Sequence, residues 1–193
     1  LYNKFDFAKD LFNKANDILE YDLKKICFSE LINNDIDKTK YTQPAIFIYS
    51  LICDYYLKDL QYEPTAFAGH SLGEYSALVS SNSLTFEDAL EIIKIRSEEM
   101  HNSGEKQKGK MAAILSSDYL EINTMINKKS SSVVIANYNS NNQTIISGKE
   151  NEIDYLINLF KTNKFRIIPL NVSGAFHSPL MNDVKKSLNE IIN

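Results

Sequence analysis

A serine between two glycines is the residue whose surroundings point most directly to chemistry. Residues 69–73 read Gly-His-Ser-Leu-Gly and fit the G-x-S-x-G pattern, in which small flanking residues allow a sharp turn that lifts the serine hydroxyl out of the backbone. A helix after this turn would let the backbone N–H of Leu72 donate to an oxyanion, and its dipole would favour negative charge there. Ser71 is therefore the candidate nucleophile, and a glycine-rich turn without chemistry is the alternative.

A nucleophilic serine needs a base, and the histidines of the sequence are His70, His101 and His177. His70 is adjacent to Ser71 along the chain and is poorly directed to deprotonate it, while His101 falls in a segment that we expect to be an exposed connector. His177 is the better candidate because it lies in the turn-rich segment 174–179, where side chains tend to be presented. A solvated loop histidine is the alternative, and no acid is identified that would orient His177.

Arg96 is expected to point inward. It lies at helical spacing from the apolar stripe of a predicted helix that begins near residue 86, a stripe made of Ala89, Ile92, Ile93 and Met100. A buried guanidinium needs an anionic partner or several acceptors, and in a chain that otherwise uses lysine it suggests bidentate recognition of a carboxylate. An internal ion pair, or a side chain that reaches out to solvent, is the alternative.

The elements around the serine turn can be predicted from periodicity. Apolar residues at helical spacing predict a helix over residues 5–23, and Gln43 with Pro44 opens a second helix through residue 57, with Pro44 suited to a first helical position. Residues 65–68 predict a short buried strand that leads into the turn, and residues 74–80 a helix after it. Thr85 and Asp88 frame a capping box for a helix to about residue 100, followed by an exposed connector over residues 101–110.

The pattern changes beyond the connector. Residues 110–116, 133–139, 143–147 and 165–171 are strand-like, whereas residues 117–127 and 150–159 are helical. The order βαββαβ is that of the ferredoxin-like arrangement, and Asn141 with Asn142 tolerates the positive φ needed at the hairpin between its middle strands. We therefore expect an inserted subdomain, after which the chain returns to the main body and forms a helix over residues 182–192.

Length and composition exclude several classes of protein. A chain of 193 residues that is 44% hydrophobic predicts one globular domain carrying an insertion, and a formal net charge of −4 argues against a nucleic-acid binder. The longest apolar run, residues 45–53, is shorter than the roughly 20 residues of a membrane span, and no secretory signal is visible. Cys27 and Cys53 have no spacing typical of a zinc site or a disulfide framework. We therefore expect no metal, nucleic acid or membrane attachment.

The serine turn belongs to a longer motif that resembles a known family. Residues 69–78, Gly-His-Ser-Leu-Gly-Glu-Tyr-Ser-Ala-Leu, closely resemble the elbow of malonyl-CoA:acyl carrier protein transacylases and of the related acyltransferase domains of fatty-acid and polyketide synthases. The resemblance covers the whole chain in the family's order and spacing. It includes residues 41–45, Arg96, and residues 109–114, 137–140, 143, 147–148 and 174–177.

This resemblance implies an α/β fold in two parts. A hydrolase-like parallel-sheet core would comprise residues 1–109 and 172–193, and the ferredoxin-like subdomain would comprise residues 110–171. Known members also have an N-terminal segment whose glutamine supplies a second oxyanion donor, and a C-terminal part whose main-chain carbonyl orients the histidine. Both are absent from this sequence, so we expect the 193 residues by themselves to have little activity. The replacement of the family's Pro-Gly by Asn141 and Asn142 is expected to be harmless.

The resemblance also implies a role for each candidate residue. Ser71 would take the malonyl group as an ester, His177 would be the general acid/base, and Leu72 would give an oxyanion N–H. Arg96 would bind the malonyl carboxylate, His70 would shape the site and Gln43 would support it. Phe176 would exclude α-branched acyl groups, because Ala-Phe-His over residues 175–177 resembles the malonyl-selective form of this segment; a core side chain is the alternative.

The activity implied is ping-pong acyl transfer in fatty-acid biosynthesis. Malonyl-CoA would esterify Ser71, and the phosphopantetheine thiol of acyl carrier protein would then attack that ester. Malonyl-CoA and acyl carrier protein are thus the expected partners, without a cofactor, and we expect a monomer located in a bacterial cytoplasm or in a plastid. A serine hydrolase or thioesterase, and a degenerate domain that only binds carrier protein, remain alternatives.

Overall fold

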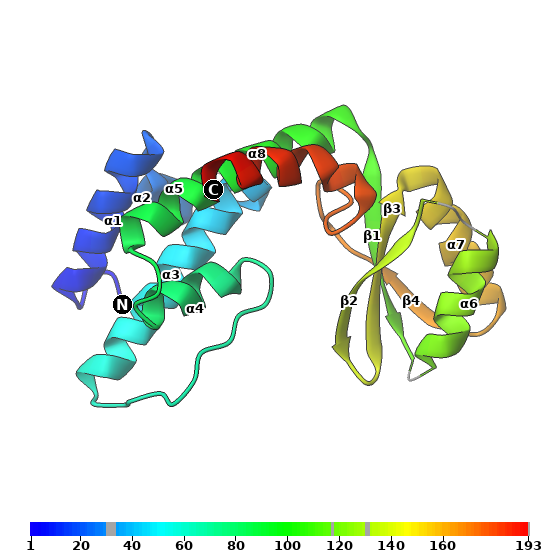
Figure 1. Ribbon diagram of the computed structural model, residues 1–193, viewed down its shortest axis with the longest axis horizontal. Coiled ribbons are helices and arrows are strands. Elements are labelled where there is room, and N and C mark those ends of the chain that lie inside the picture. Colours follow the sequence, from blue (N-terminus) through cyan, green and yellow to red (C-terminus); the bar gives the residue numbers. More distant parts are fainter. Residues whose placement is uncertain (30–33, 117, 130–131, 193) are drawn as a thin grey trace. The chain divides into compact units, whose positions relative to one another are not determined.

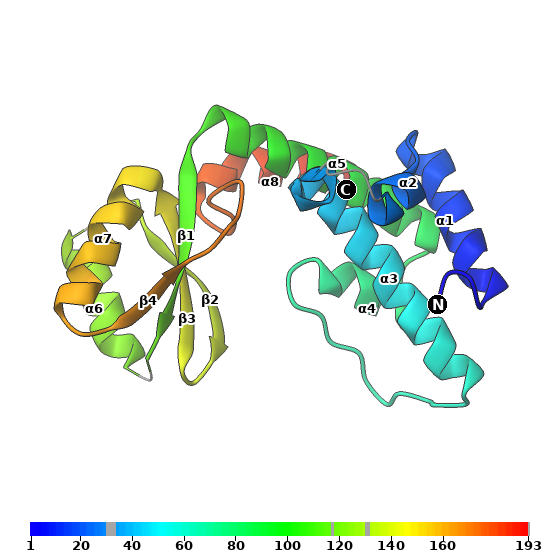
Figure 2. The ribbon, with the colours of Figure 1, turned by 180° about the vertical axis from the view of Figure 1, so that it is seen from behind.

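The computed structural model describes residues 1–29, 34–116, 118–129 and 132–192. The chain divides into two compact units, which are described separately: unit 1 comprises Leu1–Glu98 and Ile191–Asn193, and unit 2 comprises Glu99–Glu190. Figures 1 and 2 show the helices and strands of both units from opposite sides. Within the described ranges, no helix combines the length and the hydropathy required to cross a membrane.

Unit 1 is built from helices. It contains α1 (Asp6–Leu19), α2 (Leu23–Phe28), the short 3-10 helix η1 (Asn34–Asp37), α3 (Thr39–Asp59), α4 (Gly73–Ser80) and the first part of α5 (Phe86–Lys106). The helix predicted over residues 5–23 is interrupted, because Glu20 adopts a left-handed φ of 63° that ends α1 and the Asp22 side chain caps α2 by accepting from Lys25 N. Their apolar faces form one core, which includes Leu11, Phe12, Leu19, Phe47, Ile48, Leu51, Leu90 and Ile93.

Helix α3 begins four residues before the predicted start, so Pro44 lies inside it rather than at its first position. Proline cannot donate to the carbonyl four residues earlier, that of Lys40. The Tyr21 hydroxyl donates to this carbonyl instead, at 3.4 Å. The half-buried hydroxyl thus offsets a hydrogen bond that the helix cannot make, and desolvation is the main reason why the pKa of Tyr21 is raised above its ordinary value.

Two further predictions for unit 1 and its continuation are wrong. Residues 65–68 form no strand, because a strand needs a hydrogen-bonded neighbour and the sheet of the described residues lies entirely between Gly109 and Pro169. Residues 101–106, predicted as part of a connector, continue α5. The capping box of α5 is confirmed: the Asp88 amide donates to Thr85 Oγ1 at 3.1 Å, and the Thr85 hydroxyl donates to the Asp88 carboxylate at 2.6 Å.

Unit 2 contains the sheet. The strands β1 (Gly109–Leu115), β2 (Val134–Ser140), β3 (Gln143–Lys149) and β4 (Arg166–Pro169) pair antiparallel in the order β2-β3-β1-β4. Helices α6 (Tyr119–Lys129) and α7 (Glu150–Thr162) cover one face, as Figures 1 and 2 show, and bury Ala112, Ile114, Ile146, Ile122, Leu156 and Phe160 between helices and sheet. The strands and helices predicted between residues 110 and 171 are confirmed to within a few residues; residue 117 lies outside the described residues.

The hairpin between β2 and β3 differs from prediction in its backbone. Asn141 and Asn142 connect the strands, but neither has a positive φ. Two register irregularities lie in the pairing of β2 with β3, one between Ile135 and Asn137 and one, next to this turn, between Tyr138 and Ser140. Because bulges increase the local twist of a strand pair, they let the strands meet a turn that lacks the left-handed residues of the common hairpin types.

The other face of the sheet carries the segment that follows β4. Phe176 packs there against a small apolar cluster formed by Met111, Ala113 and Ile145. The segment continues into a 3-10 helix, η2 (Pro179–Met181), and α8 (Asn182–Ile192), the helix predicted over those residues. The chain thus returns across the sheet on the face opposite to α6 and α7.

Candidate active site

The serine turn has the geometry of a nucleophile elbow. Ser71 adopts a left-handed φ of 54°, a conformation that costs a non-glycine residue about 1–3 kcal/mol. Gly69 is required by the turn, because a Cβ at this position would lie 2.0 Å from the carbonyl carbon of Gly73. Gly73 is different, since a Cβ there would meet nothing within 4 Å. The turn therefore demands glycine on its entry side and holds Ser71 in a strained backbone conformation.

The amides after the serine show which backbone donor is available. Gly73 N donates to His70 O at 2.9 Å, Glu74 N to Ser71 O at 3.3 Å, and Tyr75 N to Leu72 O at 3.2 Å, which closes the first turn of α4. Among the hydrogen bonds of the described residues, none is made by the Leu72 amide. It lies at the N-cap of α4, where an N–H has no partner within the helix and can donate to an anion.

Arg96 points into unit 1, as its helical spacing predicts, and is only 8% exposed. Its Nη2 donates to Ser71 Oγ at 2.9 Å, and its Nη1 donates to Gln43 Oε1. The guanidinium also lies over the Tyr75 ring, with Cζ 5.8 Å from the ring centroid. Three helices thus meet at the elbow: α3 supplies Gln43, α4 follows Ser71, and α5 supplies Arg96.

The charge of Arg96 is held in an environment of neutral groups. In the part of the chain that the structure describes, no carboxylate oxygen lies within 4.0 Å of the guanidinium. Burial is the largest influence on the Arg96 pKa and lowers it, while Tyr75 and Glu74 act in the opposite direction. A buried cation without an anion beside it can gain free energy from an anionic ligand that brings its own oxygens into the site.

His177 and Phe176 lie in unit 2. His177 is exposed and adopts a left-handed φ of 57°, so it presents its side chain from a tight turn. The buried Ser178 stabilises this turn, since its hydroxyl donates to Ala175 O at 2.7 Å and accepts from Leu180 N at 3.2 Å. Phe176 is half-buried, and its ring lies 3.2 Å from where a Cβ on Gly174 would stand.

The structure thus brings Ser71, Leu72, Gln43 and Arg96 together within unit 1, with the exposed His70 on the same turn. Two further side chains at this site are not among the residues predicted from the sequence. Tyr75 lies one helical turn after Ser71 and carries the guanidinium over its ring. Thr39 lies one turn before Gln43 and accepts from Gln43 Nε2 at 3.0 Å. The i,i+4 spacing of Thr39 and Gln43 is visible in the sequence, but the predicted helix started too late to include Thr39.

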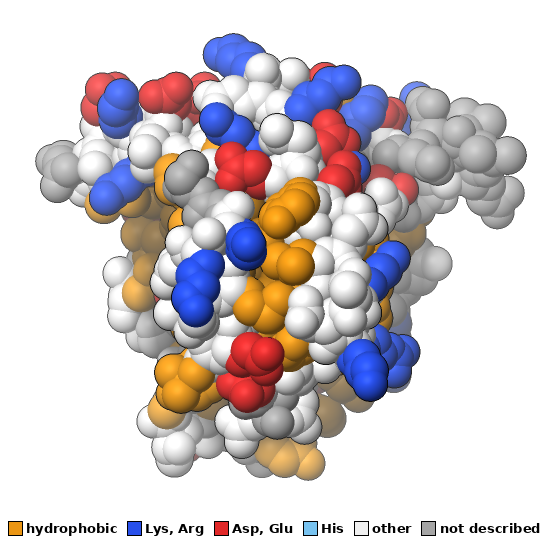
Figure 3. All heavy atoms as spheres, turned by 90° about the vertical axis from the view of Figure 1, so that its right-hand side faces the viewer, with side chains coloured by type: hydrophobic (Ala, Val, Ile, Leu, Met, Phe, Trp, Pro, Cys, Tyr) orange, Lys and Arg blue, Asp and Glu red, His pale blue; other side chains and the backbone are white. Residues whose placement is uncertain are grey.

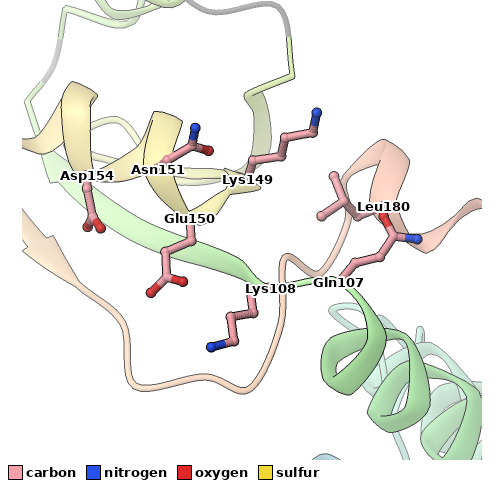
Figure 4. A pocket seen from close by; sticks show the side chains of 7 residues that line it. All are labelled: Gln107, Lys108, Lys149, Glu150, Asn151, Asp154 and Leu180. Carbon is pink, nitrogen blue, oxygen red and sulfur yellow. The ribbon is translucent and has the colours of Figure 1, made fainter.

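Unit 2 also holds a cavity of about 570 Å³ that contains none of the predicted site residues. Figure 4 shows the side chains that line it: Gln107, Lys108, Lys149, Glu150, Asn151, Asp154 and Leu180. Beside it, Lys110 Nζ lies 2.8 Å from Glu150 Oε1 and 3.0 Å from Asp154 Oδ2, and these hydrogen bonds raise the pKa of Lys110. Cations and carboxylates are therefore mixed around this cavity.

A buried arginine that donates a hydrogen bond to a serine at a tight turn, in an α/β chain, is the arrangement that the resemblance to acyltransferase domains predicts. The chain belongs to the acyl transferase domain family, which matches it over residues 1–193. It is 37% identical over 194 residues to the polyketide biosynthesis malonyl CoA-acyl carrier protein transacylase PksC of Bacillus subtilis (strain 168), a match that covers 97% of this chain and 65% of that protein.

Solved structures agree with this assignment. The malonyl CoA-acyl carrier protein transacylase of Clostridium perfringens is similar with a TM-score of 0.90 and 30% identity, over 100% of this chain and 61% of that one. A malonyl-transacylase in complex with a type II polyketide synthase acyl-carrier protein is similar with a TM-score of 0.91 and 28% identity, over 99% of this chain and 63% of that one. The chain therefore spans less than two thirds of the length of these relatives.

Proposed function

We propose that the protein transfers a malonyl group from malonyl-CoA to the phosphopantetheine thiol of acyl carrier protein, in fatty-acid biosynthesis, through a malonyl ester on Ser71. The observation that carries this proposal is the contact between the buried Arg96 guanidinium and Ser71 Oγ. It places a buried cation beside the nucleophile, on the side where the distal carboxylate of a short acyl group could be bound. The names of the similar proteins support the same substrate and acceptor.

In the first half-reaction, Ser71 Oγ attacks the thioester carbonyl carbon of malonyl-CoA and His177 takes the serine proton. The carbonyl oxygen becomes an oxyanion that accepts from the Leu72 amide at the start of α4. The C–S bond then breaks, CoA leaves with the proton held by His177, and malonyl remains as an ester on Ser71. His177 acts here as base and then as acid, so that it ends the half-reaction neutral.

In the second half-reaction, the carrier thiol attacks the ester carbonyl carbon and gives its proton to His177. The C–O bond of the ester breaks, and His177 returns the proton to Ser71 Oγ. Over the two half-reactions the acyl group moves from CoA to the carrier thiol, one proton moves from the carrier thiol to CoA, and no electrons are exchanged with a redox partner. We therefore propose that the reaction uses no cofactor.

Other residues determine what the site accepts. Arg96 would grip the malonyl carboxylate through its two terminal nitrogens, and Gln43 would hold the guanidinium in place. His70, exposed on the serine turn, would shape the entrance, and Phe176 would oppose a methyl branch at the acyl α-carbon.

We propose that residues 110–171 are a ferredoxin-like subdomain inserted into a hydrolase-like core formed by residues 1–109 and 172–193. The βαββαβ order and the antiparallel sheet order β2-β3-β1-β4 support the subdomain. The strand-less elbow segment of unit 1 would need a parallel sheet from elsewhere in the protein to complete the core.

The bacterial relatives support a cytoplasmic location rather than a plastid.

Intact-mass spectrometry tests the proposal. Incubation of the purified full-length protein with malonyl-CoA should add one malonyl mass, located by peptide mapping to Ser71, and acyl carrier protein with its phosphopantetheine arm should remove that mass and become malonylated. Carrier protein without the arm is the control and should leave the ester intact. Acylation that persists in Ser71→Ala would overturn the assignment, and loss of the malonyl group to water at the same rate with and without carrier would indicate a hydrolase.

A further inference from the structure

Side-chain hydrogen bonds run from the first residue of α3 to the nucleophile. Gln43 Nε2 donates to Thr39 Oγ1 at 3.0 Å, Arg96 Nη1 donates to Gln43 Oε1, and Arg96 Nη2 donates to Ser71 Oγ at 2.9 Å. All of these residues belong to unit 1. In this series of hydrogen-bonded side chains, Thr39 bonds neither to the guanidinium nor to the serine, so it can act on them only through Gln43.

The direction of these hydrogen bonds depends on which way the side-chain amide of Gln43 is turned. A glutamine amide can be turned by 180° with little change in shape, which exchanges its two-donor nitrogen with its acceptor oxygen. In the turned state, the Gln43 nitrogen would face the guanidinium of Arg96, and donors would oppose donors. The Arg96 guanidinium, which can only donate, selects the state in which the Gln43 oxygen faces it, and the Thr39 hydroxyl oxygen anchors the amide in that state by accepting from the Gln43 nitrogen.

Burial makes this anchoring effective. Thr39, Gln43 and Arg96 are 8%, 5% and 8% exposed, so water has little access to replace a lost partner. The backbone at Thr39 is fixed as well. Lys38 O accepts from the amides of Tyr41 and Thr42 at 2.8 and 3.0 Å. A firmly held helix start therefore presents the Thr39 hydroxyl to Gln43.

We propose that Thr39 is a positioning residue for carboxylate recognition. By fixing the amide of Gln43, it fixes the plane of the Arg96 fork, so that both terminal nitrogens are aimed at one place beside Ser71. Without Thr39, the guanidinium keeps its charge but loses the orientation that bidentate contact with a carboxylate requires. The substrate part of this inference rests on the proposed function, since it takes the malonyl carboxylate as the ligand of Arg96.

The first test compares acyl groups with and without a distal carboxylate. Thr39→Val keeps the shape of the side chain and removes the acceptor, whereas Thr39→Ser keeps the acceptor. We expect Thr39→Val to lower kcat/KM for malonyl transfer by roughly 10-fold, mainly through KM, and to change acetyl transfer by less than about 2-fold. Thr39→Ser should restore malonyl transfer.

Thr42→Val is the matched control, because it makes the same change one turn of chain away at a hydroxyl that bonds only to backbone carbonyls in the described residues. It should lower malonyl and acetyl transfer equally if it lowers either. Equal loss of both activities in Thr39→Val, or no loss of either, would overturn the proposal.

A second readout needs no catalysis. Arg96 and Arg166 are the arginines of this sequence, so protein labelled with ¹⁵N-arginine gives guanidinium signals that single substitutions can assign. Slow rotation of the Arg96 guanidinium in the wild-type protein should become faster in Thr39→Val and should be recovered in Thr39→Ser, with the exposed Arg166 as internal control. If rotation is unchanged in Thr39→Val, Thr39 does not position Arg96. If rotation changes while Arg96→Ala loses malonyl and acetyl transfer equally, the positioning holds and the proposed substrate is wrong.

Discussion

At the scale of single residues, the site combines a strained backbone with a fixed charge. Ser71 is held at φ 54°, and the hydrogen bonds of the following turn, such as Gly73 N to His70 O at 2.9 Å, keep it there. Such a conformation persists only where its surroundings determine it. Because Arg96 donates to Ser71 Oγ, the hydroxyl position is set by two separate parts of the chain, the turn and helix α5.

Arg96→Ala should remove malonyl transfer far more than acetyl transfer, because only malonyl carries a distal carboxylate. Truncation of one partner of a buried charged pair costs about 2–5 kcal/mol, which corresponds to roughly 30-fold or more in kcat/KM. Arg96→Lys should also be poor, because an ammonium cannot reproduce the two parallel N–H donors. Steady-state kinetics with both acyl-CoA substrates measure the difference. Equal losses for the two acyl groups would show that Arg96 is structural.

Phe176→Ser should narrow the preference for malonyl over methylmalonyl by about 10-fold, mainly by admitting the branched substrate. The ring also packs on Met111, Ala113 and Ile145, so the variant should melt earlier than the wild type. Phe176→Leu, which keeps an apolar side chain on that cluster, is the comparison for stability. The ratio of kcat/KM values for the two acyl-CoA substrates decides the matter: if both activities fall in parallel, Phe176 is a packing residue and selectivity arises elsewhere.

At the scale of elements, unit 2 holds the histidine-bearing segment by close backbone approach. A Cβ on Gly104 of α5 would lie 2.4 Å from Ser173 O, and a Cβ on Gly109, at the start of β1, would lie 2.4 Å from Ala175 Cβ. The Ser103 hydroxyl adds a hydrogen bond to Leu180 O at 3.0 Å. The end of α5 and the start of β1 therefore leave no space for side chains beneath residues 173–175, which lead directly to His177.

Gly104→Ala should consequently destabilise unit 2. Alanine gains about 1 kcal/mol of helix propensity over glycine, whereas forcing a methyl group against a backbone carbonyl costs roughly 1–3 kcal/mol, so the overlap prevails. Thermal denaturation should show a lower melting temperature, and malonyl transfer should fall because His177 is displaced with its segment. Gly73→Ala is the matched control for stability, since its Cβ meets no atom within 4 Å. A Gly104→Ala protein as stable as Gly73→Ala would contradict the close approach.

The elements show where sequence reasoning succeeds. Strands and helices between residues 110 and 171 follow from local periodicity, because their apolar faces pack on one another within unit 2. The start of α3 did not follow, since Pro44 is typical of a first helical turn and its lost hydrogen bond is compensated by Tyr21, a residue distant in the sequence. Residues 65–68 are apolar enough for a strand, but strand formation depends on a neighbour that their own sequence does not specify.

At the site, too, local features can be predicted from the sequence, whereas contacts between distant segments cannot. The elbow and the inward direction of Arg96 follow from spacing, because a turn motif and a helix period are local properties. The contacts of Arg96 with Gln43 and Tyr75 join three helices and could not be read from any one of them. The hydrogen bond from Gln43 to Thr39 was within reach of an i,i+4 argument, and it was missed only because the helix start was placed four residues too late.

At the scale of the whole molecule, charge should govern docking of the proposed partner, acyl carrier protein. The chain has a formal net charge of −4, and an acidic carrier protein would be repelled unless lysines are concentrated at the docking surface. The sequence offers a connector patch, Lys106, Lys108 and Lys110, and an insertion patch, Lys161, Lys164 and Arg166. Figure 3, which looks onto the side of unit 2 formed by α6 and α7, shows cationic side chains on either side of a central apolar band.

The two patches differ in how many of their cations form ion pairs. Lys110 is paired with Glu150 and Asp154, and these two carboxylates line the cavity next to Lys108, so part of the positive charge of the connector patch is offset. Among the ion pairs of the described residues, none involves Lys161, Lys164 or Arg166, and all three are exposed. The insertion patch therefore keeps its positive potential and is the stronger candidate for carrier docking.

Charge reversal of the insertion patch, by Lys161→Glu with Lys164→Glu, should raise the apparent KM for carrier protein several-fold at low salt, because long-range attraction is screened over about 10 Å at 0.1 M ionic strength. The effect should shrink as salt is added, and acylation of Ser71 by malonyl-CoA in the absence of carrier should stay unchanged. Lys106→Glu with Lys108→Glu is the matched control with the same change in net charge. A larger effect of this control pair would place docking at the connector, and equal effects would mean that carrier protein responds only to the total charge of the molecule.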